Sequence, residues 1–80
     1  MQDTQIYEKL TIVFHDIFDD KSIILSPTTS AADIDAWDSF NHINLVLAVQ
    51  ASFGVKFSST ELESMENVGD IAALIQKKLA

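Results

Sequence analysis

Hydrophobic residues recur at helical spacing near the start of the chain. Between Thr4 and Phe18 they step mainly by three or four residues, which places them on one helical face. The members of this face are Ile6, Leu10, Val13, Phe14 and Ile17. The pattern predicts an amphipathic helix over 4–18.

The segment 19–38 has no persistent period of either two or 3.6 residues. Its centre, Ser26-Pro27-Thr28-Thr29-Ser30, consists of turn-forming residues. A connection of this length is uncommon in a compact domain, so we expect its own apolar residues to hold it against the core. These residues are Ile24, Leu25, Ile34 and Trp37.

Helical periodicity returns at residue 39 and continues to residue 53. Two adjacent stripes alternate here, one of Phe40, Ile43 and Leu47 and one of Val46, Val49 and Phe53. The two stripes predict a central helix that buries more than one face. Gly54 follows at the position of a left-handed C-terminal cap.

Two further helices are predicted in the last part of the chain. Ser58-Ser59-Thr60-Glu61 has the capping-box pattern and begins a helix that extends to about Met65. Asn67 is a second N-cap. It precedes a last helix whose apolar face consists of Val68, Ile71, Ile75 and Leu79. The pattern therefore predicts an all-α chain of four helices in a single domain, 1–80.

Composition narrows the classes of function. Twelve acidic residues against five lysines give a formal net charge of -7, which repels nucleic acid and anionic lipid and favours basic protein partners. Cysteine is absent from the 80 residues, so disulfides and thiolate metal sites are excluded. No segment has the pattern of a leader or a membrane span, so we expect a cytoplasmic protein without stable membrane insertion. We also expect it to be a monomer.

The candidate chemistry lies at Asp38-Ser39, directly before the central helix. The pair has the composition of a helix N-cap, which occurs in proteins of every function. His42 stands three residues after Ser39, but the chain has no nucleophile elbow or oxyanion loop, which argues against a Ser-His hydrolase. Asp33, Asp35 and Asp38 lack the glycine and terminal glutamate of a calcium-binding loop, so no metal site is expected.

The serine and the hydrophobic spacing after it resemble the acyl carrier protein family. The resemblance extends over nearly the whole chain and is carried by Asp38-Ser39-Phe40 and then by Ile43, Val46, Leu47, Phe53, Val55, Phe57, Met65, Val68, Ile71 and Ile75. It implies a four-helix bundle of acyl-carrier type with a long loop between helices one and two and a short third helix. It also implies a 4′-phosphopantetheine arm, derived from coenzyme A, on Ser39, with Asp38 as the flanking motif residue.

The resemblance implies a carrier, not an enzyme, that holds acyl groups as thioesters and delivers them to other proteins. Its partners would be a phosphopantetheinyl transferase and enzymes of the acyl-activating, acyltransferase or ketosynthase type. The expected walls of an acyl-chain cleft are Ile43, Leu47, Leu62, Met65, Ile71 and Ile75, which are equally suited to be core.

The chain departs from the family at the surface that many fatty-acid carriers use for docking. Those carriers have acidic residues along the second helix, whereas no charged residue occurs between Ser39 and Val55 here. Docking is therefore expected to rely on apolar and hydrogen-bonding contacts. The predicted docking residues are Trp37, Phe40, Asn41, His42 and Asn44, with Trp37 alternatively the link between loop and core.

These departures predict a specialised carrier for a lipid, polyketide or surface-polysaccharide pathway. Two alternatives remain open from the sequence. One is a peptidyl or aminoacyl carrier of a nonribosomal-type pathway, which shares the fold and the modified serine. The other is an unmodified helical interaction module in which Asp38-Ser39 is only a cap.

Overall fold

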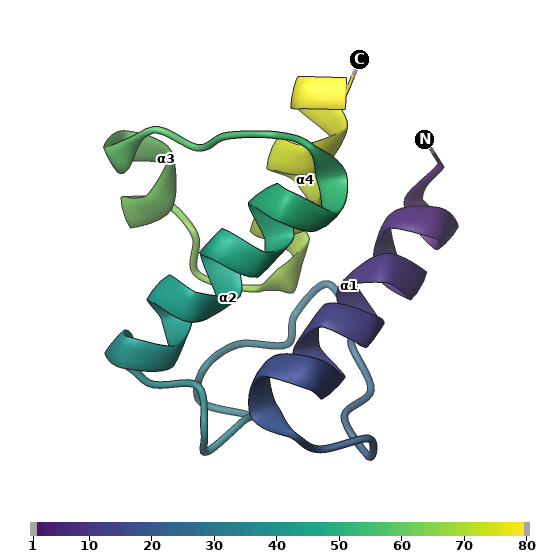
Figure 1. The fold of residues 1–80 in the computed structure, drawn as a ribbon, viewed down its shortest axis with the longest axis vertical. Helices are drawn as coiled ribbons and strands as arrows, with labels where there is room; N and C mark the ends of the chain where they lie inside the picture. The colour runs from purple at the N-terminus through teal and green to yellow at the C-terminus, as the bar shows by residue number, and fades with distance from the viewer. Residues whose placement is uncertain (1, 80) are drawn as a thin grey trace.

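A computed structural model describes residues 2–79 as four helices joined around one core (Figure 1). The helices are α1 (Asp3–Phe18), α2 (Ser39–Phe53), α3 (Ser59–Glu63) and α4 (Val68–Leu79). α1 packs against both α2 and α4. Within 2–79 there are no strands apart from an isolated bridge between Ser30 and Asn67. The all-α prediction, with its long loop and short third helix, is confirmed.

The ends of α2 and α3 follow from the local sequence. Gly54 ends α2 in the left-handed conformation, with φ of 67°, as predicted. At α3, Ser58 and Glu61 form the predicted capping box. This helix ends at Glu63, earlier than predicted, where the Ser64 hydroxyl donates a hydrogen bond of 2.8 Å to the carbonyl oxygen of Glu61.

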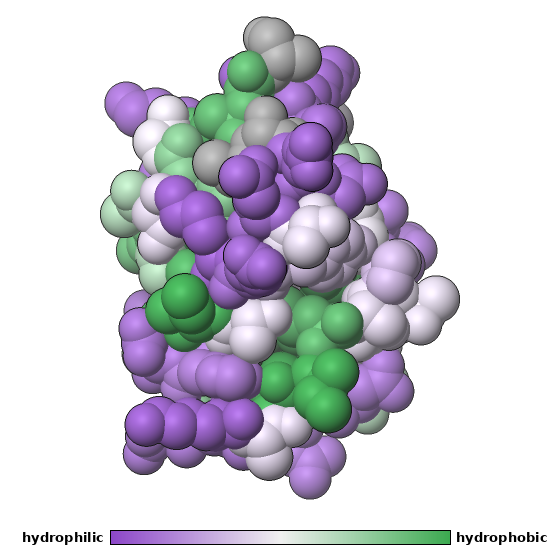
Figure 2. Space-filling view, turned by 90° about the vertical axis from the view of Figure 1, so that its right-hand side faces the viewer, coloured by the Kyte–Doolittle hydropathy of each residue, from purple (hydrophilic) through white to green (hydrophobic). Residues whose placement is uncertain are grey.

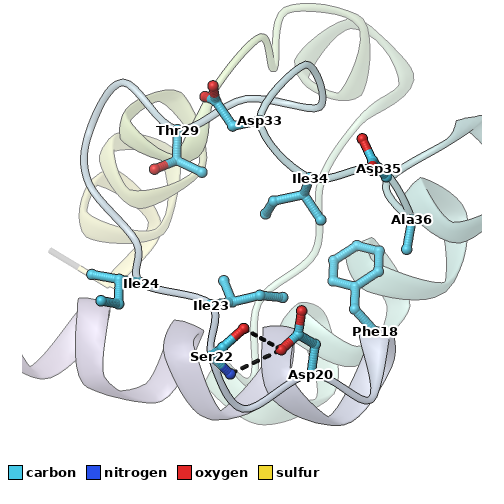
Figure 3. Close-up of a pocket in the computed structure, with 10 residues that line it drawn as sticks. All are labelled: Phe18, Asp20, Ser22, Ile23, Ile24, Thr29, Asp33, Ile34, Asp35 and Ala36. Carbon is cyan, nitrogen blue, oxygen red and sulfur yellow. Dashed lines mark hydrogen bonds between the residues drawn. The ribbon is translucent and has the colours of Figure 1, made fainter.

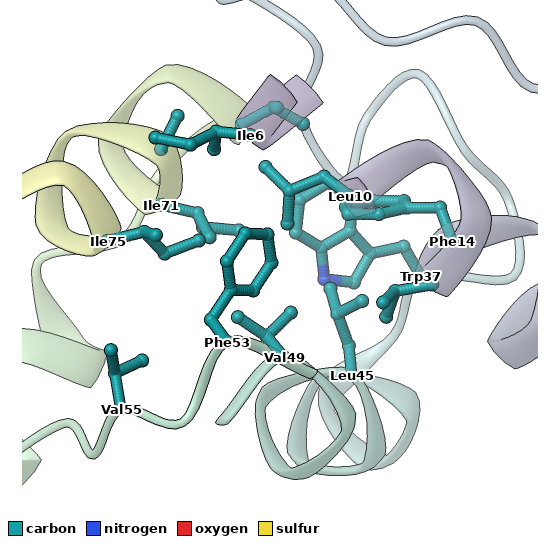
Figure 4. Close-up of a cluster of buried hydrophobic side chains, with 13 residues drawn as sticks. Ile6, Leu10, Phe14, Trp37, Leu45, Val49, Phe53, Val55, Ile71 and Ile75 are labelled. Carbon is teal, nitrogen blue, oxygen red and sulfur yellow. The ribbon is translucent and has the colours of Figure 1, made fainter. Parts of the chain in front are cut away.

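The hydrophobic core is formed by one face of each long helix (Figure 4). α1 contributes the stripe that periodicity predicted, and four of its residues are buried. α4 contributes Val68, Ile71, Ala72 and Ile75. The loop before α2 adds the indole of Trp37, which packs edge-on against Phe14 with ring centroids 5.3 Å apart.

α2 differs from its prediction, because it buries one face and not two. Its buried residues are Leu45, Val46, Val49 and Phe53. The stripe of Phe40, Ile43 and Leu47 is exposed, with fractions of 74%, 62% and 58%. α1 packs against the buried side, and the five-residue α3 is too short to cover the opposite side.

The long loop is held to the protein at both of its ends. Leu25, Ile34 and Trp37 pack against the core as predicted, but Ile24 is 88% exposed and the prediction for it is wrong. In the middle of the loop, where Thr29 is buried, backbone hydrogen bonds add to side-chain packing. The N–H of Val68 donates to the carbonyl oxygen of Thr29 at 2.8 Å, and the next N–H along α4 donates to that of Pro27 at 2.9 Å. The loop is thus fixed to the first turn of α4.

The outer surface on the side of α1 is mainly hydrophilic, with separate hydrophobic patches between the polar residues (Figure 2). Among residues 2–79, the large hydrophobic side chains that are exposed are Ile12, Ile24, Phe40, Ile43, Leu47 and Leu79. Half of these lie on α2, in the stripe described above. None of the helices in this part of the chain is long and apolar enough to cross a membrane.

Candidate functional site

Ser39 is the first residue of α2 and is exposed. The capping function belongs to its neighbour, because the carboxylate of Asp38 accepts a hydrogen bond of 2.8 Å from the backbone N–H of Asn41. Asp38 is itself extended, as an N-cap residue should be. Ser39 is therefore not needed as a cap, and its hydroxyl is accessible to another protein.

The helix start around Ser39 is suited to a negative charge. The first N–H groups of a helix have no partner within the helix, and the helix dipole is positive at this end. The carboxylate of Asp38 accepts a hydrogen bond from the N–H of Asn41. Within residues 2–79, the N–H groups of Ser39 and Phe40 donate no hydrogen bond. The first turn contains no acidic residue. An anion on the Ser39 hydroxyl would meet these two free donors.

A pocket of about 450 Å³ adjoins Ser39. It lies where the long loop, the start of α2 and the connection between α3 and α4 meet. The residues that line it are Ala31, Trp37, Asp38, Ser39, His42, Met65 and Glu66. The fold therefore places next to Ser39 two residues, Met65 and Glu66, that are distant from it in sequence.

Trp37 and His42 form a hydrogen-bonded pair within this pocket. The indole Nε1–H of Trp37 donates to Nδ1 of His42 at 3.0 Å, and the two rings stack with an interplanar angle of 21°. Partial burial lowers the pKa of His42 below its ordinary value. Trp37 is only 7% exposed and packs in the core, which favours its alternative role as a link between loop and core, while its role in docking stays a prediction.

The other predicted docking residues lie around the start of α2. Phe40 and Asn44 are exposed, whereas Asn41 and His42 are half-buried. The side-chain amide of Asn41 donates a hydrogen bond of 2.7 Å to the carbonyl oxygen of Ala36, which ties the end of the loop to the helix. Part of the predicted docking set therefore also holds the site together.

The predicted acyl-cleft residues divide into three groups. Ile43 and Leu47 are exposed on α2, Ile71 and Ile75 are buried in the core, and Leu62 and Met65 are half-buried. Met65 lines the pocket at Ser39, but the other members of the set do not. The core positions of Ile71 and Ile75 agree with the alternative that these residues are core, and an acyl cleft formed by all six stays a prediction.

A second pocket, of about 480 Å³, lies between the end of α1 and the long loop (Figure 3). Phe18 and Ile34 line it together with the carboxylates of Asp20, Asp33 and Asp35. The hydrogen bonds that Ser22 donates to Asp20 lower the pKa of that carboxyl. None of the predicted site residues lines this pocket, so it is separate from the site at Ser39.

The helical fold, with an exposed serine at a helix start and a pocket beside it, is that of a carrier domain. No protein-family model matches the chain. It is 33% identical over 76 residues to an acyl carrier protein of Thermotoga maritima, covering 94% of this chain and 93% of that protein. It is 30% identical over 81 residues to an acyl carrier protein of Thermosynechococcus vestitus, covering 100% and 99%.

A solved structure is also similar. The solution NMR structure of a holo acyl carrier protein from Geobacter metallireducens superposes with a TM-score of 0.87 at 48% identity, covering 91% of this chain and 84% of that one. The chain belongs to the acyl carrier protein family. Membership in this family confirms three predictions: the fold, the role of a carrier and not an enzyme, and 4′-phosphopantetheine as the prosthetic group.

Proposed function

We propose that Ser39 is the residue that carries the 4′-phosphopantetheine arm and that the chain presents acyl groups on it as thioesters. The observation that supports this assignment best is that capping and exposure fall on two different residues at the start of α2. Asp38 caps the helix, and Ser39 is left exposed beside two free backbone N–H groups. A cap serine would have its oxygen directed at the backbone, away from a modifying enzyme.

The chemistry of attachment fits this position. A phosphopantetheinyl transferase would form a bond between Ser39 Oγ and the phosphorus of coenzyme A that bears the pantetheine, and the adenosine bisphosphate would leave as the old P–O bond breaks. The resulting phosphodiester is an anion, which the first turn of a helix stabilises. When bound, the arm supplies the thiol that this cysteine-free chain lacks.

The surface around Ser39 supports a specialised partner. α2 has no charged residue, although the protein as a whole has a net charge of -7. We place partner contacts at Phe40, Asn41, His42 and Asn44, where the enzyme would meet an aromatic ring and neutral hydrogen-bonding groups. The partners would be a transferase and acyl-transferring enzymes of one dedicated pathway in the cytoplasm, and their binding would depend little on salt.

The attachment site is tested by intact mass after incubation with coenzyme A and a broad-specificity transferase. The chain provides a matched control, because Ser59 is also the exposed first residue of a helix but follows Ser58 in place of an aspartate. We expect wild type and Ser59→Ala to gain one arm and Ser39→Ala to gain none. Modification of Ser39→Ala, or no modification of the wild type by several transferases, would contradict the assignment.

A further inference from the structure

The hydrogen bond between Trp37 and His42 fixes the protonation state of the imidazole. Indole Nε1–H is only a donor, so Nδ1 of His42 must accept and cannot carry a proton. The neutral ring therefore carries its proton on Nε2. Among residues 2–79, the His42 ring makes its hydrogen bond through Nδ1, and Nε2 has no partner. No fully buried side-chain nitrogen or oxygen in this part of the chain lacks a partner, so Nε2 is not fully buried. The Nε2–H group is thus a donor accessible from solvent.

His42 also has a distinct place in the pocket at Ser39. Apart from Ser39 itself, the lining consists of an alanine, a methionine, two carboxylates, the engaged indole of Trp37 and the imidazole of His42. Asp38 and Glu66 are acceptors and would repel an anion. Among these lining residues, His42 is therefore the one side chain with a free donor for an anion on Ser39. The two residues are also three apart on α2, a spacing that places side chains on the same face.

We propose that the Nε2–H of His42 is the side-chain donor that binds the phosphodiester on Ser39, with Trp37 as the positioning residue that keeps the proton on Nε2. The inference rests on the proposed attachment of the arm to Ser39. It adds a specific contact to the backbone donors of the helix start, and it restricts the first part of the arm to the pocket side of α2.

The contact predicts a change in the titration of His42. In the unmodified chain, burial holds its pKa low. The groups that face His42 are Trp37 from the loop, Asp38 one turn before it and Glu66 from the connection before α4. Attachment adds a negative charge to these surroundings, which favours the protonated imidazole, so the pKa of His42 should rise.

Imidazole nitrogen NMR tests this inference on chains whose modification has first been established by intact mass. His15 is the internal control, because its Nε2 is hydrogen-bonded to the carbonyl oxygen of Ile23 and does not line the pocket at Ser39. We expect the Nε2–H tautomer at His42 in the unmodified chain and a pKa of His42 that rises on modification. The ring resonances of His15 should be unaffected by the arm. The phosphorus resonance of the arm should titrate with the pKa of His42.

Two substitutions separate the contact from a structural effect. In His42→Gln the side chain retains an N–H donor but does not titrate, so the pH dependence of the phosphorus resonance should disappear. The chemical shift of the phosphorus should stay near the value that the wild type has at high pH. In Trp37→Phe the ring remains but the donor is lost, so the Nδ1–H tautomer of His42 should become populated.

The outcomes distinguish this inference from the function on which it rests. A chain that takes no arm contradicts the proposed function, and the inference with it. A modified chain whose His42 has the same pKa as before, or whose phosphorus resonance is indifferent to His42, overturns the inference alone. The Nδ1–H tautomer in the unmodified wild type would also overturn it, because the positioning role of Trp37 would be lost.

Discussion

Replacement of Gly69 by alanine should destabilise the protein, although alanine is the better helix former. Gly69 is the second residue of α4 and lies beneath the long loop. A Cβ atom there would be 2.7 Å from the carbonyl oxygen of Pro27 and 3.2 Å from Oδ1 of Asn67. The first distance is shorter than real Cβ contacts, and its partner is backbone. The loop must therefore move away from the first turn of α4.

The magnitude follows from the contacts that this movement breaks. The loop is fixed here by the hydrogen bonds from Val68 N–H to Thr29 and from Gly69 N–H to Pro27, at 2.8 and 2.9 Å. Each contributes about 1 kcal/mol, and the helix propensity of alanine offsets at most about 1 kcal/mol of the total. With the lost packing of buried Thr29, the net cost is about 1 to 2 kcal/mol. A domain of this size loses about 4 to 8 °C in Tm per kcal/mol.

Urea unfolding followed by circular dichroism measures this loss. The control is Gly54→Ala, where a Cβ meets nothing within 4 Å but φ is +67°. Its cost of about 1 kcal/mol comes from backbone strain alone. Amide exchange at Val68 separates the two variants, because only Gly69→Ala should release that N–H from the loop. A Gly69→Ala chain that is as stable as the wild type, with the Val68 amide still protected, would show that a Cβ at position 69 does not displace the loop.

The cap of α3, the imidazole of His42 and the exposed stripe on α2 can each be tested by substitution. Ser58→Ala removes the oxygen that accepts the Glu61 N–H at 3.2 Å and should cost about 1 kcal/mol in urea unfolding, whereas no loss would show that α3 does not need its cap. Burial lowers the pKa of His42, so the unfolded chain binds that proton more tightly, and stability should decline as pH falls below about 6.5 and level off below the folded-state pKa. His42→Gln should remove this part of the pH dependence in thermal unfolding, and an unchanged profile would contradict it. Ile43→Ser and Leu47→Ser on the exposed stripe should change stability in urea unfolding by less than about 0.5 kcal/mol, and a large loss of stability would show that the stripe is core.

Much of the fold could be predicted because local signals agree with the tertiary structure. The bounds of α2, its glycine cap and the capping box of α3 are all determined by residues within a few positions of each other. The core face of α1 follows from a single clear stripe, since a surface helix with one apolar face has only one way to bury it.

The orientation of α2 could not be predicted from its own pattern. Both of its apolar stripes satisfy helical periodicity, and which one is buried depends on how far α3 extends over the other side. α3 ends early, at Glu63, and Ile43 and Leu47 remain exposed. Periodicity reports which residues share a face but not which element covers that face.

The surroundings of Ser39 could not be predicted from the sequence. The motif points to Ser39, whose modification stays a prediction, but the hydrogen bond of Trp37 with His42 depends on how an irregular loop meets the helix. No period describes such a loop. The one available signal was the isolated tryptophan directly before the motif, whose indole N–H requires a partner when it is buried.

The proposed arm on Ser39, holding acyl groups as thioesters, is tested by loading the modified chain with an acyl group using an acyl-activating enzyme. The intact mass is measured before and after treatment with neutral hydroxylamine, which cleaves thioesters. We expect one acyl group per chain, lost on treatment and never acquired by Ser39→Ala. An acyl group that survives hydroxylamine, or one that Ser39→Ala also acquires, would contradict it.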